Sequence, residues 1–441
     1  MIRRPHKVLR PRGQVAIPPA DAPTALLIVH AAELVTLRAP YTRARRREEM
    51  RSLGIIPDGA VYLEGGRVKE VGDTRDVLRV RGGTRDVIDA TGKVVLPGLV
   101  DAHTHAAFAG SRHHELPWKA DGLSYQEIAA RGGGILSTVR DTRAAPREAL
   151  IAGTRKRLDG MLRFGTTTAE IKSGYGLTPE AELEILLAID ELSNIHPIRL
   201  VSTFLGAHTV PPEFEGRGGA YADLVANEMI PAIATRSGAR FCDVWVEEGA
   251  FTPDQARRIF AAGKERGLDP KVHADELSDA GGAALSAEVG AVSADHLIHA
   301  SDAGLRAMAE AGVIGVLLPA TSLAAKLPFA DARRIINAGV AVALGTDLNP
   351  GSWNESLQSV IALGTHRLGM YPEEALTAAT VNAAFAIGKG REVGTLEPGM
   401  AADLLVLDAD SVGHLGYRLT GNLVEKVVKA GRVVVDRAPL R

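Results

Sequence analysis

Four side chains of the kinds that bind transition metals fall at the ends of apolar runs. His103 and His105 are one residue apart and follow a run that starts at Val94. Because side chains alternate along a strand, both imidazoles project to the same side, where they can grip one divalent metal. His273 and Asp347 close two later runs. Three imidazoles and one carboxylate suit zinc or ferrous iron and leave a position for water, whose pKa a metal lowers toward ~7.

Other titratable residues occupy matching positions. The last residues of further apolar runs, or those just beyond them, are Glu170, Lys172, His208, Glu247, Glu248, Glu276, Asp295 and His296. Charged side chains are rarely buried without partners, and the strand ends of a parallel barrel converge at its C-terminal mouth. We therefore expect these residues to form one site at that mouth.

The elements that must position these residues alternate along the chain. Between Val94 and about Gly388, short apolar runs alternate with helical stretches such as 179–192 and 253–266, each with a threonine as N-cap and a proline at the first helical position. The runs are 94–105, 166–172, 201–208, 241–248, 271–276, 291–296, 315–319 and 340–347. An open doubly wound sheet is the alternative, but the dinucleotide-binding Gly-x-Gly-x-x-Gly turn and the P-loop are both missing. The pattern favours an α/β fold with a (β/α)8 barrel of the TIM type.

Both ends of the chain have the sequence pattern of small β-sheet domains. Strand-like runs occur at 26–29, 60–63, 68–71 and 87–88, and again at 402–407 and 424–435. We expect segments 24–93 and 393–441 to pair into one discontinuous β-sandwich domain, with the barrel, 94–392, inserted between them. Residues 1–23 are expected to form a flexible extension.

Composition narrows the class of protein. A net charge of −2 and an aromatic content of 4% argue against binding of nucleic acid or anionic membranes, and no apolar run reaches the length of a membrane span. The single cysteine, Cys242, excludes an intramolecular disulfide and fits a reducing compartment. We expect a cytoplasmic protein with a small-molecule substrate.

Residues 97–105 resemble the signature of the amidohydrolase superfamily. Further motifs resemble the imidazolonepropionase family within it, over nearly the whole chain: 108–112, 124–128, 132–138, 170–176, 203–208, 273–277 and 346–352. The resemblance implies hydrolysis of 4-imidazolone-5-propanoate to N-formimidoyl-L-glutamate in histidine degradation, one divalent or trivalent metal ion per subunit, zinc or iron, and a homodimer.

The resemblance also implies roles for individual residues. His103, His105, His273 and Asp347 match the metal ligands, and the positions that contact substrate or product are matched by Arg112, Tyr125, Tyr175, His208, Glu276, Asn349, Gly351 and Ser352. Arg112 offers a planar fork for the propanoate. Glu276, His208, His296 and Asp347 are the candidates for proton transfer. Whether Asp347 or His296 is the general base, and whether Glu276 is an acid or a substrate anchor, stays open.

Three further points concern the number of metal ions, the substrate and the alternative functions. Two-metal barrels of this type often use a carbamylated lysine on the fourth strand, whereas Lys172 lies on the second, so we expect one metal and a structural or substrate-facing Lys172. Segments 116–119 and 323–326 depart from the family pattern and bear on substrate detail. The alternatives are a related amidohydrolase acting on another N-heterocycle, as a deaminase or cyclic amidase, and a scaffold without catalysis, which typically loses metal ligands that here are all present.

Overall fold

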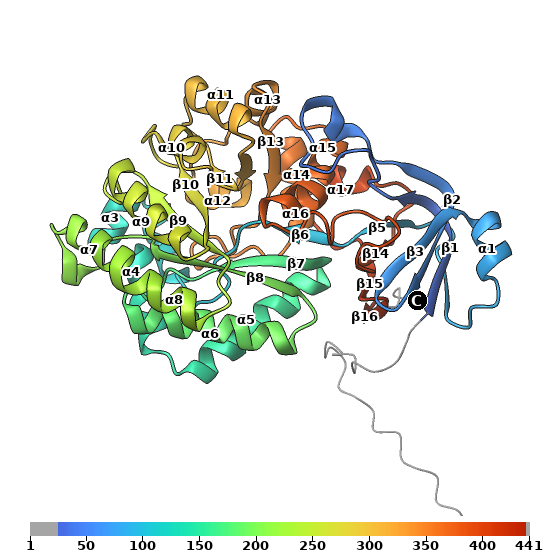
Figure 1. The fold of residues 1–441 in the computed structure, drawn as a ribbon, viewed down its shortest axis with the longest axis horizontal. Coiled ribbons are helices and arrows are strands. Elements are labelled where there is room, and N and C mark those ends of the chain that lie inside the picture. The colour runs from blue at the N-terminus through green and yellow to red at the C-terminus, as the bar shows by residue number, and fades with distance from the viewer. Residues whose placement is uncertain (1–24, 438–441) are drawn as a thin grey trace, which may run out of the picture.

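The computed structural model describes residues 25–437, apart from the side chains of Tyr125 and Gln126. The expected extension, 1–23, lies outside the described residues. Two bodies lie side by side: a barrel wrapped by helices and a smaller sheet at one end of it (Figure 1). Among the described residues, no helix is both long and apolar enough to cross a membrane.

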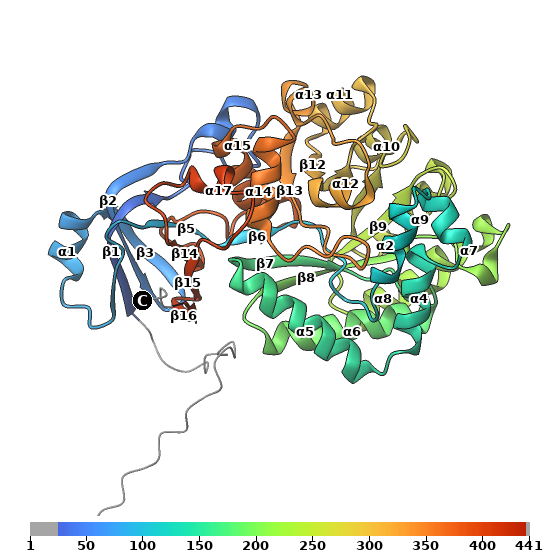
Figure 2. The same ribbon diagram turned by 180° about the vertical axis from the view of Figure 1, so that it is seen from behind.

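The barrel is a parallel sheet of eight strands in sequential order, as the alternating runs predict. The strands are β6 (Leu99–Asp101), β7 (Thr166–Lys172), β8 (Arg199–Ala207), β9 (Phe241–Val246), β10 (Asp269–Ala274), β11 (Ser293–His296), β12 (Ile314–Leu317) and β13 (Ala341–Leu344). Helices cover the outside of this sheet, as Figure 2 shows from behind. The fold class expected from the sequence is therefore confirmed.

Short turns and the following α-helices connect the strands. They are α1 (Thr74–Arg81), α2 (Leu116–Ala120), α3 (Tyr125–Ala130), α4 (Gly134–Ala144), α5 (Arg147–Arg163), α6 (Pro179–Ile195), α7 (Gly218–Leu224), α8 (Ile230–Arg236), α9 (Pro253–Glu265), α10 (Gly282–Glu288), α11 (Asp302–Ala311), α12 (Pro319–Ala325), α13 (Ala332–Asn337), α14 (Leu357–His366), α15 (Pro372–Thr377), α16 (Ala383–Ala386) and α17 (His414–Tyr417). The expected caps are present, because the hydroxyls of Thr178 and Thr252 accept from the backbone N–H groups of Ala181 and Gln255.

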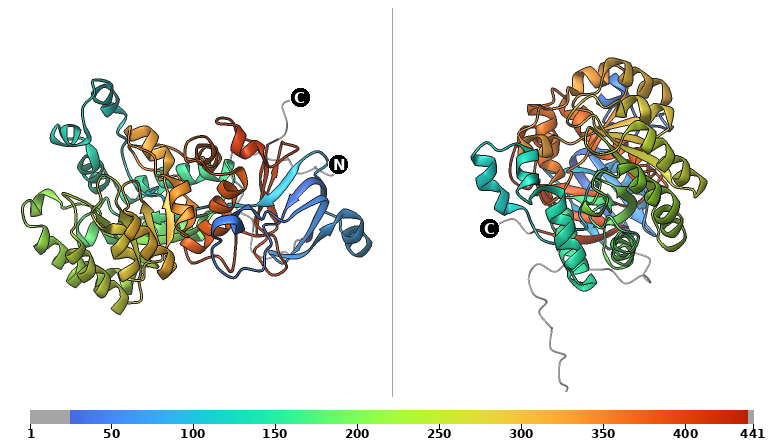
Figure 3. Two further views of the ribbon diagram at one scale, coloured as in Figure 1. Left: turned by 90° about the horizontal axis from the view of Figure 1, so that it is seen from above. Right: turned by 90° about the vertical axis from the view of Figure 1, so that its left-hand side faces the viewer.

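The two ends of the chain form the second sheet, which is mixed and also has eight strands. Its strands are β1 (Ala25–Val35), β2 (Ile55–Glu64), β3 (Arg67–Asp73), β4 (Val87–Asp89), β5 (Val94–Pro97), β14 (Leu404–Leu407), β15 (Val424–Lys429) and β16 (Arg432–Asp436). Blue N-terminal and red C-terminal strands lie together at the same end of the molecule in the left-hand view of Figure 3. The exact limits of the domains, 24–93 with 393–441 and 94–392, stay predictions.

The run 94–105 differs from the single barrel strand that we expected. Its first part, β5, pairs with β1 and β14 in the terminal sheet, and only β6 belongs to the barrel. Gly98 separates them at a close crossing, because a Cβ there would lie 2.2 Å from Thr167 Oγ1. The chain therefore enters the barrel directly from the terminal sheet.

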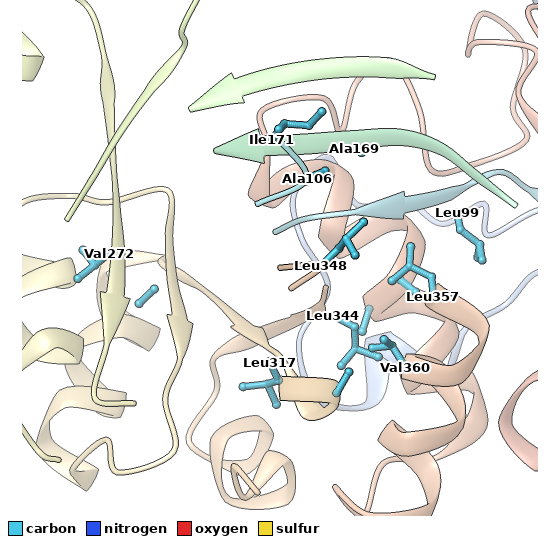
Figure 4. Packing of buried hydrophobic residues seen from close by; sticks show 14 of the residues in the cluster. Leu99, Ala106, Ala169, Ile171, Val272, Leu317, Leu344, Leu348, Leu357 and Val360 are labelled. Atoms are coloured by element: carbon cyan, nitrogen blue, oxygen red, sulfur yellow. The ribbon is translucent and has the colours of Figure 1, made fainter. Parts of the chain in front are cut away.

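The main apolar cluster lies between the barrel strands and the helices outside them. Figure 4 shows part of it, with Leu344 of β13 facing Leu357 and Val360 of α14, and Ile171 on β7. Polar side chains alternate with apolar ones along several strands, as Glu170 and Lys172 do with Ile171 on β7, because successive side chains point to opposite faces. On β12 and β13 the alternate residues form a second apolar cluster, which includes Val316 and Ala343. The polar side chains toward the C-terminal ends of the strands are the setting for the site.

Candidate metal and substrate site

A cavity of about 430 Å³ opens at the C-terminal ends of the barrel strands, where the sequence places the site. Most of the predicted residues line it: His105, Arg112, Tyr175, His208, His273, Glu276, His296, Asp347, Asn349, Gly351 and Ser352. His103 is fully buried beside the cavity. Tyr125 begins α3, and its side chain lies outside the described residues.

Backbone hydrogen bonds fix the first and last ligand segments against each other. The N–H of Asp347 donates to the carbonyl of His103, and the N–H of His105 donates to the carbonyl of Leu348, both at 3.0 Å. The Asp101 carboxylate accepts from both the backbone N–H and the hydroxyl of Thr346. These contacts join the end of β6 to the segment after β13, so residues 242 positions apart in sequence, His105 and Asp347, share one corner of the barrel.

Three imidazole nitrogens and one carboxylate oxygen converge at the buried side of the cavity. The Nε2 atom of His105 lies 3.2 Å from Nε2 of His103 and 3.3 Å from Nε2 of His273. Asp347 Oδ1 lies 3.6 Å from His103 Nε2 and 3.5 Å from His105 Nε2. Ligands about 2.0–2.1 Å from a tetrahedral zinc would be about 3.3 Å apart, so these spacings fit a metal ion.

Asp347 has an oxygen left for such an ion. Its Oδ2 accepts from the hydroxyl of Thr321 at 2.6 Å, whereas its Oδ1 is buried and makes no hydrogen bond. Unpaired buried carboxylate oxygens are costly, and a bound cation removes the cost. The donor set therefore fits the metal that the sequence predicts, and Thr321 is a supporting residue that sequence reasoning did not single out.

Two more histidines lie beside these four ligands. His208 and His296 each form a compact group of potential ligands with residues of the predicted set. The Nδ1–H of His208 donates to the carbonyl of Gly174 at 3.0 Å, which leaves its Nε2 as an acceptor. Burial lowers the pKa of His208 to about 3, so the ring is neutral and stacks on His105 with centroids 4.9 Å apart.

Glu276 is the carboxyl group in this cavity suited to donating a proton. Burial, and then the charges of Asp347 and Glu247, raise its pKa to about 8. Its Oε1 lies 3.6 Å from His296 Nδ1. A neutral Glu276 beside an imidazole is an arrangement typical of proton transfer.

Left-handed backbone conformations, which are rare outside glycine, occur in and beside the cavity lining, among them at Asp275, His296 and Asp347. The φ angles are 52° at Asp275, 77° at His296 and 48° at Asp347. Asp275 is held there because its carboxylate accepts from the N–H groups of Gly282 and Ala283 at the start of α10. Such conformations concentrate at functional sites, where the surroundings hold the strain.

Three basic side chains, Arg112, Lys119 and Lys326, also line the cavity. Arg112 is mostly buried, its Nε has no hydrogen-bond partner, and it lies 3.7 Å from Glu115 Oε1. Lys119 and Lys326 line the same cavity, and Lys326 Nζ donates to the carbonyl of Lys119 at 2.9 Å. These lysines come from the two segments that depart from the family pattern, 116–119 and 323–326. The sequence signal for them was the basic charge at the end of each segment.

Asn349 shapes the wall beside Arg112. Its Oδ1 accepts from the N–H groups of Gly351 and Ser352, and its Nδ2 donates to the carbonyl of Asp347. The amide is thus engaged in a turn that carries Gly351 close to Arg112. Asn349 lines the cavity, but this structure uses its side chain to build the turn.

Several of the strand-end residues that we expected at the site do not line the cavity. Glu170, Lys172 and Asp295 are fully buried in the barrel and absent from the lining. Glu247 lines no part of the cavity and accepts from the N–H of Leu277 at 2.8 Å. Lys172 is therefore not substrate-facing.

Comparisons with known proteins show which family the chain belongs to. Residues 246–434 and 86–134 match models of the amidohydrolase family. The imidazolonepropionase of Geobacillus kaustophilus is 49% identical over 415 residues, covering 93% of this chain and 98% of that protein. The imidazolonepropionase of Symbiobacterium thermophilum is 50% identical over 424 residues, covering 95% and 99%. Among solved structures, an E. coli guanine deaminase has a TM-score of 0.71 at 17% identity, covering 94% of this chain and all of that one, and it shares the fold.

Proposed function

This chain belongs to the imidazolonepropionase family of amidohydrolases, and from that premise we propose how its site opens an imidazolone ring. The reaction is hydrolysis of the cyclic amide of 4-imidazolone-5-propanoate to N-formimidoyl-L-glutamate, a step of histidine degradation. The observation that carries the assignment to this site is one cavity lined both by metal-type donors and by Arg112.

His103, His105, His273 and Asp347 are the residues that would hold the metal, which we propose to be one zinc or iron ion per subunit. When bound, it supplies Lewis acidity at the ring carbonyl and lowers the pKa of water. The surroundings of Lys172 support one ion over two, because its ammonium contacts three carboxylates and a carbamate there would add a fourth negative charge.

Arg112 would hold the propanoate tail. Its guanidinium has a buried N–H that makes no hydrogen bond, although Glu115 lies within ion-pair distance, and arginine matches carboxylates in a planar fork. Tyr175, with its ring 5.9 Å from that of His105, and His208 would wall the flat ring. A purine or pyrimidine lacks an acidic tail for Arg112 to bind, so the deaminase alternative is not favoured.

Proton transfers then need one acceptor and one donor. Water adds to the ring carbonyl carbon and gives its proton to Asp347 or His296. The bond from that carbon to the ring nitrogen breaks, and a proton reaches the departing nitrogen. Neutral Glu276 supplies this proton in our proposal, because its raised pKa keeps it protonated at neutral pH.

We also propose that the protein is a cytoplasmic homodimer. The lone, buried Cys242 supports a reducing compartment. The family resemblance is the basis for the dimer, which sedimentation velocity would test directly.

The test of the function is loss of the ultraviolet absorbance of 4-imidazolone-5-propanoate on addition of enzyme. We expect turnover by the wild-type protein and a KM raised at least tenfold in Arg112→Ala. No turnover, or ammonia release from purines or pyrimidines, would contradict the assignment.

A further inference from the structure

Lys172 lies beneath the histidine cluster and contacts three carboxylates. Its Nζ is 2.7 Å from Asp243 Oδ2, 2.9 Å from Glu170 Oε1 and 3.5 Å from Asp295 Oδ2. All four side chains are fully buried. Burying an ion costs several kcal/mol unless it is well paired, so such a cluster needs each of its members.

Two of these carboxylates also contact proposed metal ligands, through the same oxygens. Asp295 Oδ2 hydrogen-bonds His103 Nδ1 at 2.6 Å. Asp243 Oδ2 lies 3.0 Å from His273 Nδ1, within ion-pair distance but without hydrogen-bond geometry. Asp243 Oδ1 accepts from the backbone N–H of His273 at 3.2 Å. Each shared oxygen therefore joins the ammonium to the Nδ1 side of one imidazole.

The opposite nitrogens of the two rings face the metal site. His103 Nε2 and His273 Nε2 lie 3.2 and 3.3 Å from His105 Nε2. A carboxylate on Nδ1 fixes both the tautomer and the orientation of a ligating histidine. The carboxylates in turn need something to fix them, since two negative groups side by side repel each other.

We infer that Lys172 is a positioning residue, whose single ammonium holds Asp243 and Asp295 in place and through them fixes the rings of His103 and His273 for one metal ion. The inference rests on the proposed metal site. It gives Lys172, which sequence alone left as either structural or substrate-facing, a specific role.

If Lys172 acted only through its charge, its removal would change the metal affinity in the opposite direction. Removing a buried cation leaves more negative charge near the metal, which strengthens the binding of a divalent ion. Loss of orientation weakens binding instead, and changes at residues that orient metal ligands typically lower affinity by ~10–100-fold. The sign of the change in affinity therefore separates a positioning role from a general electrostatic one.

Lys271 provides a matched control. It is also fully buried in the barrel, with Nζ 3.2 Å from Glu170 Oε1 and 3.3 Å from the carbonyl of Ala102. Among the carboxylates of residues 25–437, Glu170 alone lies within ion-pair distance of its Nζ. Lys271→Met thus removes a buried charge that acts on Asp295 through space, but it breaks no ion pair with Asp243 or Asp295.

The experiment compares wild type, Lys172→Met, Lys172→Gln and Lys271→Met as metal-free proteins. Thermal unfolding without metal measures the loss of stability, and competition with a chromophoric chelator measures zinc affinity. The visible spectrum of the cobalt-loaded proteins reports ligand geometry. Lys172→Gln keeps a hydrogen-bond donor, so it replaces Lys172→Met in these measurements if Lys172→Met does not fold.

We expect the methionine variants to unfold at similarly lowered temperatures. The Lys172 variants should bind zinc ~10–100-fold more weakly and show an altered cobalt spectrum, while Lys271→Met stays within threefold of wild type. Unchanged or tighter binding in the Lys172 variants, or equal weakening in Lys271→Met, overturns the inference. A wild-type protein that binds no metal overturns the proposed metal site itself.

Discussion

Gly351 allows Arg112 to reach the cavity, and Gly351→Ala should push it away. A Cβ at this position would lie 1.7 Å from Arg112 Nη2 and 2.7 Å from its Cζ. An ordinary contact needs at least 3.4 Å, so the guanidinium must move by about 1.7 Å. A hydrogen bond to a charged group contributes ~1.5–3 kcal/mol, and such a shift removes at least one. Since 1.4 kcal/mol is a factor of ten, KM should rise by about 10- to 150-fold.

The assay is steady-state loss of substrate absorbance, with two controls. Gly219 lies in α7 with open space around its Cβ position, so Gly219→Ala should leave kinetics unchanged. A substrate analogue whose propanoate is replaced by the neutral propanamide should bind wild type and Gly351→Ala equally. A KM within twofold of wild type, or a lowered kcat at unchanged KM, would refute the placement of the carboxylate against Arg112.

Three further changes test other parts of the site. Because the raised pKa of Glu276 is about 8, kcat/KM should fall as pH rises through that value, and Glu276→Gln should lose this alkaline limb; a profile unchanged by the substitution would exclude Glu276 as the acid. His296→Ala should lower kcat by ~10²–10⁴ with metal content intact, and near-normal turnover would remove His296 from the chemistry. Arg157 is buried and donates to the carbonyls of Ala106 and Phe108, which follow the His-x-His segment. Arg157→Met should therefore lower the free energy of unfolding, measured by urea denaturation, by ~2–4 kcal/mol, and an unchanged denaturation midpoint would contradict this.

The sequence predicts those parts of the fold that local patterns determine. Apolar runs bounded by polar residues located all eight barrel strands, and the strand ends placed His105, His273 and Asp347 at one cavity. The division of the run 94–105 was not predictable in this way, because β5 is defined by its pairing with β1 and with β14, about 310 residues further on.

The polar layer beneath the site also depends on long-range geometry. Lys172, Asp243 and Asp295 belong to three strands, and their contacts follow from the register between strands. The sequence pattern predicts that Lys172 and Asp295 lie at strand ends, but it does not predict whether their side chains face the cavity or the barrel interior. Lys119 lies in the short helix α2 and Lys326 caps the C-terminus of α12, and helices this short carry too few turns for a periodic pattern to report direction.

The most direct test of the whole account measures metal content and product on one preparation. Enzyme loaded with zinc or iron should carry one ion per chain, and 4-imidazolone-5-propanoate should yield a single product heavier by one water molecule, with no ammonia released. Asp347→Asn, which removes the unpaired ligand oxygen, should lose both the ion and the turnover. Two ions per chain, release of ammonia, or full turnover by metal-free enzyme would contradict a single-metal hydrolytic centre.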